Sequence, residues 1–256
     1  MEISISLIGL IFGSFFNMLI YRLPLGVSLL NPKRSICPNC NYQLKWYENI
    51  PLFSYLFLKG KCSNCSKEIS IFYPTVELLT ALVTLLLFIK IGLNIEFLIT
   101  TLLFYILIIL SFIDLRYKAV PDYLLIIVFI CALFIPHFSF YNALVFAGGF
   151  VLLELFVTFY IQNIKSRILK DDSLKTQRAM GEGDIPIAAV IGGLLGIKLG
   201  IVAIFLASIF AIIPSLINSF IKKDIETPFI PYLSLGLFAV FVFDENIKNI
   251  LGGIIQ

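Results

Sequence analysis

The chain has 256 residues, of which 59% are hydrophobic and only 14% are charged. Soluble domains usually carry about 25% charged residues and about 45–50% apolar residues, so much of this chain must face lipid. The formal net charge is +3, and no basic patch interleaved with aromatic residues occurs, which argues against nucleic acid as a partner. The sequence therefore predicts an all-α polytopic membrane protein.

Eight apolar segments approach the length of about 20 residues that a helical membrane span needs, although several are short. They are 3–21, 75–91, 97–113, 122–140, 141–162, 185–199, 200–220 and 229–243. The segments 185–199 and 200–220 can be divided differently, depending on where the chain breaks between Gly196 and Gly200. No small-residue cleavage site follows the first segment, so we expect it to stay as a first span.

Basic residues indicate the orientation of these spans. If the N-terminus is external, the cytosolic loops hold 16 Lys and Arg residues and the external loops hold 3. These cytosolic loops are 22–74, 114–121, 163–184 and 221–228. Because short cytosolic loops are enriched in Lys and Arg, we expect both termini to be external.

Composition divides the chain into three parts. These are a first transmembrane helix at 1–21, a polar cytosolic loop domain at 22–74, and a membrane core of about seven helices at 75–256. The loop of about 50 residues is too short to bury a large core, and small domains of this size often depend on a structural metal.

Four cysteines in the loop have the spacing of a zinc site. Cys37 and Cys40 form one C-x2-C pair, and Cys62 and Cys65 form a second after 21 intervening residues. Two such pairs supply four thiolates to one tetrahedral ion with no open position, so the zinc would be structural. The alternative is two disulfides or free thiols, although a cytosolic location argues against disulfides.

Two acidic residues lie where predicted spans meet the cytosolic side. Asp114 closes the span 97–113, and Asp184 precedes the span 185–199 in Gly181-Glu182-Gly183-Asp184. Two aspartates that meet can hydrolyse a peptide bond, because one takes a proton from water while the other, protonated, polarises the carbonyl. Glycines beside Asp184 would permit a close backbone approach. The pattern alone equally permits two helix caps at an interface.

Other polar residues in the predicted spans are less informative. Gly13, Ser14 and Asn17 favour close helix packing with a hydrogen bond. Glu77 and Glu154 are candidates either to line the site or to pair with a basic residue. His137 is the only histidine and falls on the external side, which leaves none for a catalytic triad or a histidine-ligated zinc peptidase.

Taken together, these residues resemble a known family, the type IV prepilin peptidases, which are leader peptidases and N-methyltransferases. The likeness covers most of the chain. Its segments are 12–17 with 21–24, 34–40, 46–51, 60–65, 73–79, Ile113-Asp114 with Pro121-Asp122, 181–184, and 227–232. So many segments in the right order are far more specific than the G-x-G-D motif alone.

The resemblance implies an aspartic endopeptidase of the bacterial cytoplasmic (inner) membrane with Asp114 and Asp184 as its catalytic pair. It would cleave the leaders of type IV prepilins and pseudopilins of type II secretion at the cytosolic face, beside the lipid bilayer. It would then methylate the new N-terminus with S-adenosylmethionine, an activity linked in the family to the cysteine loop. Pro186 and Phe72 stand where the family often has Lys and Arg, so any role of those basic residues is not carried over.

Two rival classes predict different features. A transporter with paired intramembrane acids would place them near the bilayer midplane and show symmetry between halves, and the sequence shows neither. A non-enzymatic zinc scaffold of a secretion machine would need no acid pair. The sequence does not indicate which prepilins are substrates, where S-adenosylmethionine binds, or the oligomeric state.

Overall fold

The computed structural model describes residues 1–29, 35–37, 39–170, 172–176, 180–221 and 228–254. The chain divides into two compact units, Met1–Pro121 and Asp122–Gln256. The described residues form helices and two isolated antiparallel bridges, with no sheet. The all-α prediction is confirmed. Five basic residues assigned to the cytosolic side lie outside the described residues: Lys33, Arg34, Arg178, Lys222 and Lys223.

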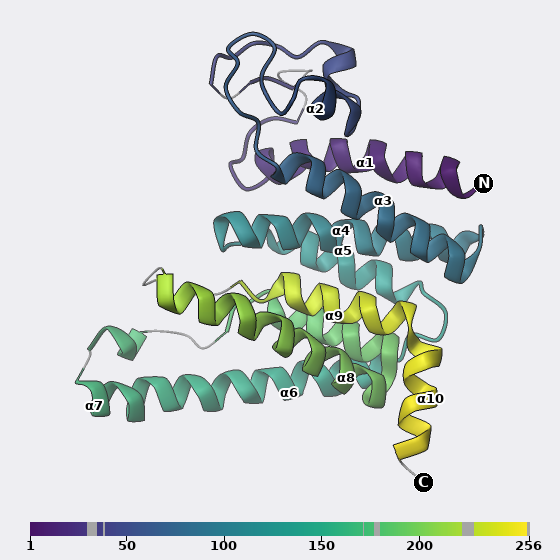
Figure 1. The fold of residues 1–256 in the computed structure, drawn as a ribbon. Coiled ribbons are helices and arrows are strands. Elements are labelled where there is room, and N and C mark those ends of the chain that lie inside the picture. The colour runs from purple at the N-terminus through teal and green to yellow at the C-terminus, as the bar shows by residue number, and fades with distance from the viewer. Residues whose placement is uncertain (30–34, 38, 171, 177–179, 222–227, 255–256) are drawn as a thin grey trace. The chain divides into compact units, whose positions relative to one another are not determined.

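Three long helices form the membrane part of the first unit: α1 (Glu2–Arg22), α3 (Phe72–Ile91) and α4 (Ile95–Tyr117) (Figure 1). Asn94 begins α4 as a true cap, since its side chain accepts a hydrogen bond from the Phe97 N–H at 2.8 Å. Gly92 ends α3 with a φ of 77°, a conformation that favours glycine.

Two glycines set the contact between α1 and α3. A Cβ added at Gly9 would lie 2.7 Å from the Cα of Ala81, and one at Gly13 would lie 2.6 Å from the Cα of Glu77. The helices are therefore antiparallel and touch backbone to backbone, as small-xxx-small sequences allow in membranes. This confirms the packing role predicted for Gly13.

The polar loop between α1 and α3 carries two short helices, η1 (Trp46–Asn49) and α2 (Phe53–Phe57). Figure 1 shows this loop over the end of α1 and α3 from which it emerges. The Glu48 carboxylate holds η1 by accepting the Lys45 N–H at 2.7 Å. Burial opposes ionisation of Glu48, but hydrogen bonds from Ser63, Lys45 and Tyr42 outweigh it and lower the pKa of this carboxyl.

The second unit begins with α5 (Asp122–Leu133) and α6 (Phe140–Phe159), and also contains α8 (Asp184–Ile221), α9 (Ile230–Val242) and α10 (Asp244–Ile254). α8 is broken at Gly196, which has φ 71° and ψ −178°. An added Cβ at Gly192 or at Gly200 would clash with Phe146 of α6, so that ring packs against α8 on both sides of the break. The break falls where the sequence left the division of 185–220 open.

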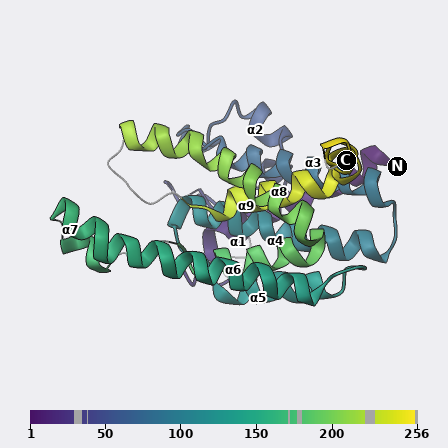
Figure 2. The same ribbon diagram turned by 90° about the horizontal axis from the view of Figure 1, so that it is seen from below.

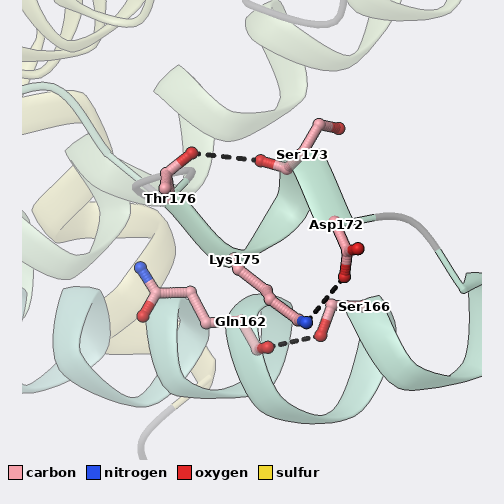
Figure 3. Close-up of polar contacts among 6 residues, drawn as sticks. All are labelled: Gln162, Ser166, Asp172, Ser173, Lys175 and Thr176. Atoms are coloured by element: carbon pink, nitrogen blue, oxygen red, sulfur yellow. Dashed lines mark hydrogen bonds and ion pairs between the residues drawn. The ribbon is translucent and has the colours of Figure 1, made fainter.

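α6 continues into a π-helical turn, η2 (Tyr160–Lys165), and then α7 (Ser166–Leu169), as both Figure 1 and Figure 2 show. A short 3-10 helix, η3 (Asp172–Thr176), follows. Figure 3 shows the polar contacts of this segment, including the Lys175–Asp172 ion pair at 2.6 Å and the Ser166 hydroxyl donating to the Gln162 carbonyl. These contacts are local and mostly exposed, so they order the segment without forming a site.

The expected number of eight spans is not confirmed. Among the described residues, five helices are long and apolar enough to cross a membrane, or six if the bent pair α9–α10 counts as one. This count takes α8 as one helix, although α8 consists of two helical segments that meet at the non-helical Gly196, close to the boundary expected between spans 185–199 and 200–220. The expected span 122–140 contains only the 12 residues of α5, because the helix ends at Leu133 ahead of Pro136. Twelve helical residues extend about 18 Å, against about 30 Å of hydrocarbon.

Candidate functional site

The four loop cysteines come together. Their sulfurs all lie within 4.8 Å of one another, and the Sγ atoms of Cys37 and Cys65 are 3.9 Å apart. Four sulfurs bound to one zinc at about 2.3 Å would be separated by about 3.8 Å. None of the four forms a disulfide. This geometry fits a tetrahedral metal ion and disagrees with the alternative of two disulfides.

The two cysteine pairs repeat one backbone design. Asn41 N–H donates to the Cys37 carbonyl and Ser66 N–H donates to the Cys62 carbonyl, each at 2.9 Å. Asn41 and Ser66 both have positive φ, 54° and 57°. One bridge closes each turn, at Ile36–Gln43 and at Lys61–Glu68. The sequence hardly shows this repeat, since only the cysteines and one asparagine recur at the spacing of 25 residues.

Hydrogen bonds to the sulfurs favour negative charge in the cluster. The backbone N–H of Tyr42 and the side chain of Asn64 lower the pKa of the Cys40 thiol to about 7. The pKa of Cys65 is raised to about 11, because its hydrogen bond from the Lys67 backbone is outweighed by burial and by the neighbouring sulfurs. Thiols held this close do not all ionise without a cation, which is what a metal ion supplies.

Asp114 lies in the last turns of α4 and is buried, with 8% of its surface exposed. The helix ends directly after it: Lys118, in the left-handed conformation, donates its N–H to the Asp114 carbonyl at 2.9 Å. Arg116 lies over the rings of Tyr21 and Tyr117. Asp114 is therefore placed at the end of a membrane helix, as the sequence predicted.

Asp184 is the first residue of α8 and is 4% exposed. Its Oδ2 accepts the Gly181 N–H at 3.2 Å, so the glycine motif folds back onto the carboxylate. Pro186 lies in the first turn of α8, as predicted. An added Cβ at Gly181 would sit at an ordinary 3.6 Å from that oxygen, so this contact does not require glycine, and the close approach predicted for the glycines stays a prediction.

Asp114 belongs to the first unit and Asp184 to the second. Their meeting in one site therefore stays a prediction.

Acidic residues beside Asp184 face a small cavity within the second unit. Its volume is about 330 Å³, and it is lined by Asp122 of α5 together with Glu182, Pro186 and three apolar residues of α5. The sequence analysis assigned no role to Glu182 beyond its place in the motif 181–184. The alternation of glycine and acid in that motif could have indicated that two acids lie in this turn.

Glu77 was expected either to line the aspartate site or to pair with a basic residue; the structure shows neither among the described residues and places Glu77 at a different cavity. It is buried on α3, its Oε2 accepts the Leu52 N–H at 2.8 Å, and it lines a cavity of about 850 Å³ within the first unit. Glu154 is half-buried on α6 in the other unit.

Comparison with known proteins identifies the chain's relatives. Residues 7–91 match the bacterial peptidase A24 N-terminal domain, and residues 101–216 match the type IV leader peptidase family. A prepilin leader peptidase/N-methyltransferase of Bacillus subtilis (strain 168) is 31% identical over 93% of this chain and 93% of its own length. The chain belongs to the type IV leader peptidase family.

Further relatives with the same name extend the likeness. The protein of Vibrio cholerae serotype O1 is 32% identical over 81% of this chain and 83% of its own length. That of Legionella pneumophila is 31% identical over 98% of this chain and 95% of its own length. No solved structure matches the chain. Family membership and the apolar helices together show a membrane protein.

Proposed function

We propose that this protein is a membrane aspartic endopeptidase that removes the leaders of type IV prepilins and pseudopilins. The observation that carries the proposal is a pair of buried aspartates at helix ends, in a chain of the type IV leader peptidase family. Asp114 closes α4, and Asp184 opens α8 with a backbone N–H on its carboxylate. Acids at helix ends suit a peptidase at the membrane face better than a transporter with acids at midplane.

In the proposed reaction the two carboxyl groups share one proton, because like charges a few ångströms apart cannot both ionise in poor solvent. The ionised member takes a proton from water, which attacks the scissile carbonyl. The protonated member donates a hydrogen bond to the carbonyl oxygen as negative charge develops there. The Gly181 N–H donates to the Asp184 carboxylate and so holds it in place, and the acid and base roles belong to the pair.

We further propose N-methylation of the new N-terminus as a second activity, with S-adenosylmethionine as methyl donor. The name shared by the relatives supports it. For the loop we propose zinc, held by Cys37, Cys40, Cys62 and Cys65, with a structural role because four sulfurs leave no open position. We retain 1–21, 22–74 and 75–256 as functional parts, set in a bacterial cytoplasmic membrane with the active site facing the cytosol.

Co-expression with a candidate prepilin tests both activities. Leader loss is read as a mobility shift on a gel, and N-terminal methylation as a 14 Da increment by mass spectrometry. An uncut prepilin beside correctly inserted protein would contradict the proposal.

A further inference from the structure

One cavity of the first unit lies between the cysteine loop and the ends of α1, α3 and α4. Its volume of about 850 Å³ is within the range of small-molecule sites, roughly 300–1,000 Å³. Two of the metal-site cysteines, Cys37 and Cys62, are among its lining residues. Neither Asp114 nor Asp184 lines it, so the proposed peptidase chemistry does not account for it.

A buried acid lies on the α3 side of this cavity. Glu77 is 8% exposed, and no cation pairs with it among the described residues. Its carboxyl accepts hydrogen bonds from the Leu52 N–H at 2.8 Å and from the Ser14 side chain, and Leu52 has a φ of 60°, which is unusual for a bulky residue. A carboxylate can accept about four hydrogen bonds, so Glu77 has capacity left for a positively charged ligand.

A second buried polar group lies one turn nearer the loop. Asn17 on α1 is 8% exposed and lines the cavity, and its amide nitrogen donates to the Tyr73 carbonyl at 3.1 Å. Its Oδ1 has no hydrogen-bond partner among the described residues. Buried polar atoms in native proteins nearly always have partners, so this oxygen indicates a donor that the described residues of the first unit do not supply.

Aromatic and basic residues line the cavity toward the loop. Tyr21, Tyr73 and Phe72 line it, and Phe72 packs edge-to-face on Phe112 with ring centroids 4.8 Å apart. Arg22 also lines it, and its Nη1 donates to the carbonyls of Ser28 and Leu29, each at 3.0 Å. The cavity thus offers a buried acid and aromatic faces to a ligand.

We propose that this cavity is the S-adenosylmethionine site, with Glu77 and Asn17 holding the positively charged methionine part of the donor. The proposal rests on the N-methyltransferase activity proposed above. When bound, S-adenosylmethionine supplies a methyl group on a positively charged sulfur, and it also carries an ammonium, a carboxylate and an aromatic base. The positively charged groups suit the buried acid Glu77 and the Asn17 oxygen, and the aromatic base suits the aromatic residues of the cavity.

Methyl transfer from the donor to the amine needs no further reactant. The amine nitrogen of the trimmed substrate forms the new N–C bond while the S–C bond breaks, and the amine loses one proton to solvent. S-adenosylhomocysteine leaves with an uncharged sulfur. The Glu77 carboxylate therefore favours the charged donor over the spent product, which makes release of the product easier.

Binding of radiolabelled S-adenosylmethionine to the full-length protein in nanodiscs tests the site directly. Glu77→Gln keeps the size of the side chain and an oxygen for the Leu52 N–H, so we expect it to weaken binding at least tenfold while prepilin cleavage continues. Glu96→Gln on α4 is the matched control, because Glu96 does not line the cavity, and it should bind as the wild type does. Wild-type affinity in Glu77→Gln would overturn the proposal.

Ultraviolet cross-linking of the labelled donor to the wild-type protein gives a second readout that needs no variant. Label should map to peptides within 14–22 and 72–77, and label confined to residues 122–254 would overturn the proposed site. A wild-type protein that cleaves prepilin but binds no donor would refute both the site and the proposed methylation, and would leave the peptidase standing.

Discussion

Asn17 and Tyr73 are joined across the first helix pair by a hydrogen bond from the Asn17 amide to the Tyr73 carbonyl, 3.1 Å long. The bond continues the register set by Gly13 against Glu77, since each step of four residues along α1 matches a step of four back along α3. The Tyr73 carbonyl, in the first turn of α3, can accept this hydrogen bond because no bulky side chain separates the two backbones.

Adding a methyl group at Gly13 should therefore destabilise the protein. The new Cβ would lie 2.6 Å from the Glu77 backbone, so the helices must move apart, at a cost of about 1–3 kcal/mol. We expect Gly13→Ala to lower the thermal unfolding midpoint of the purified protein. Gly148→Ala on α6 is the control, because nothing lies within 4 Å of its added Cβ. It should be neutral or stabilising by up to about 1 kcal/mol. Equal midpoints for the two variants would contradict the packing described.

The cysteine cluster predicts about one zinc per chain. Cys37→Ser or Cys62→Ser removes one thiolate and opens the ion to water, so zinc should be lost and the loop 22–74 should become sensitive to protease. Metal analysis and limited proteolysis measure the two effects, with Cys131→Ser on α5 as the control outside the cluster. Leader cleavage should continue in both cluster variants, since no step of the proposed hydrolysis uses the metal. Purified protein without zinc but with disulfides would contradict this account.

The membrane topology depends on whether α5 crosses. Asp114 and Asp184 are separated by α5 and α6, so they share a face only if both helices cross or neither does. α6 with its extension is long enough, whereas α5 has 12 residues. Because apolar residues continue to Ile135, we expect α5 to cross in a thinned region of the bilayer.

Reporter fusions check this arrangement. Fusions at Asn94, His137 and the C-terminus should be external, and fusions at Asn41 and Ser173 should be cytosolic. The His137 fusion decides the matter. A cytosolic score there, with Ser173 external, would put the two aspartates on opposite faces and remove the proposed active site.

Local patterns predicted much of what the structure contains. The C-x2-C spacing placed four sulfurs together because each turn is built from eight consecutive residues. The packing role of Gly13 was predictable from its size alone. The C-terminal end of α4 and the start of α8 were predictable because polar residues interrupt apolar runs there.

Contacts between distant segments were not predictable in the same way. Hydropathy does not show where α5 ends, because the apolar residues continue past Leu133 to Pro136. It also does not show that Phe146 packs against α8 on both sides of Gly196. The hydrogen bond from the Leu52 N–H to the Glu77 carboxylate joins residues 25 positions apart, and no periodic pattern in the sequence predicts it. The cavity beside Glu77 therefore appeared only in three dimensions.

The aspartate pair is the centre of the account, and substitution by Asn isolates its chemistry. Asn keeps the size of Asp and can still accept the Gly181 N–H, but it can neither take a proton from water nor share one with a partner. Asp114→Asn and Asp184→Asn should each lower cleavage by a factor on the order of 10³ or more, and the double variant should lose little further, because the two groups act as one unit.

Two controls separate chemistry from folding. Asp244→Asn on α10 changes an acid whose carboxylate pairs with exposed Lys248 at 2.7 Å, and it should cleave normally. Asp122→Asn, at the start of α5, should show only a modest loss if that residue acts as a helix cap. All variants should insert and retain zinc.

The most direct measurement is the initial rate of leader removal from one purified prepilin by wild-type, Asp114→Asn, Asp184→Asn and double-variant protein in nanodiscs. The account predicts that both single variants fall to the same residual rate as the double variant, with the zinc content unchanged. Near-normal cleavage by either single variant would contradict the two-aspartate mechanism and direct attention to Asp122 and Glu182.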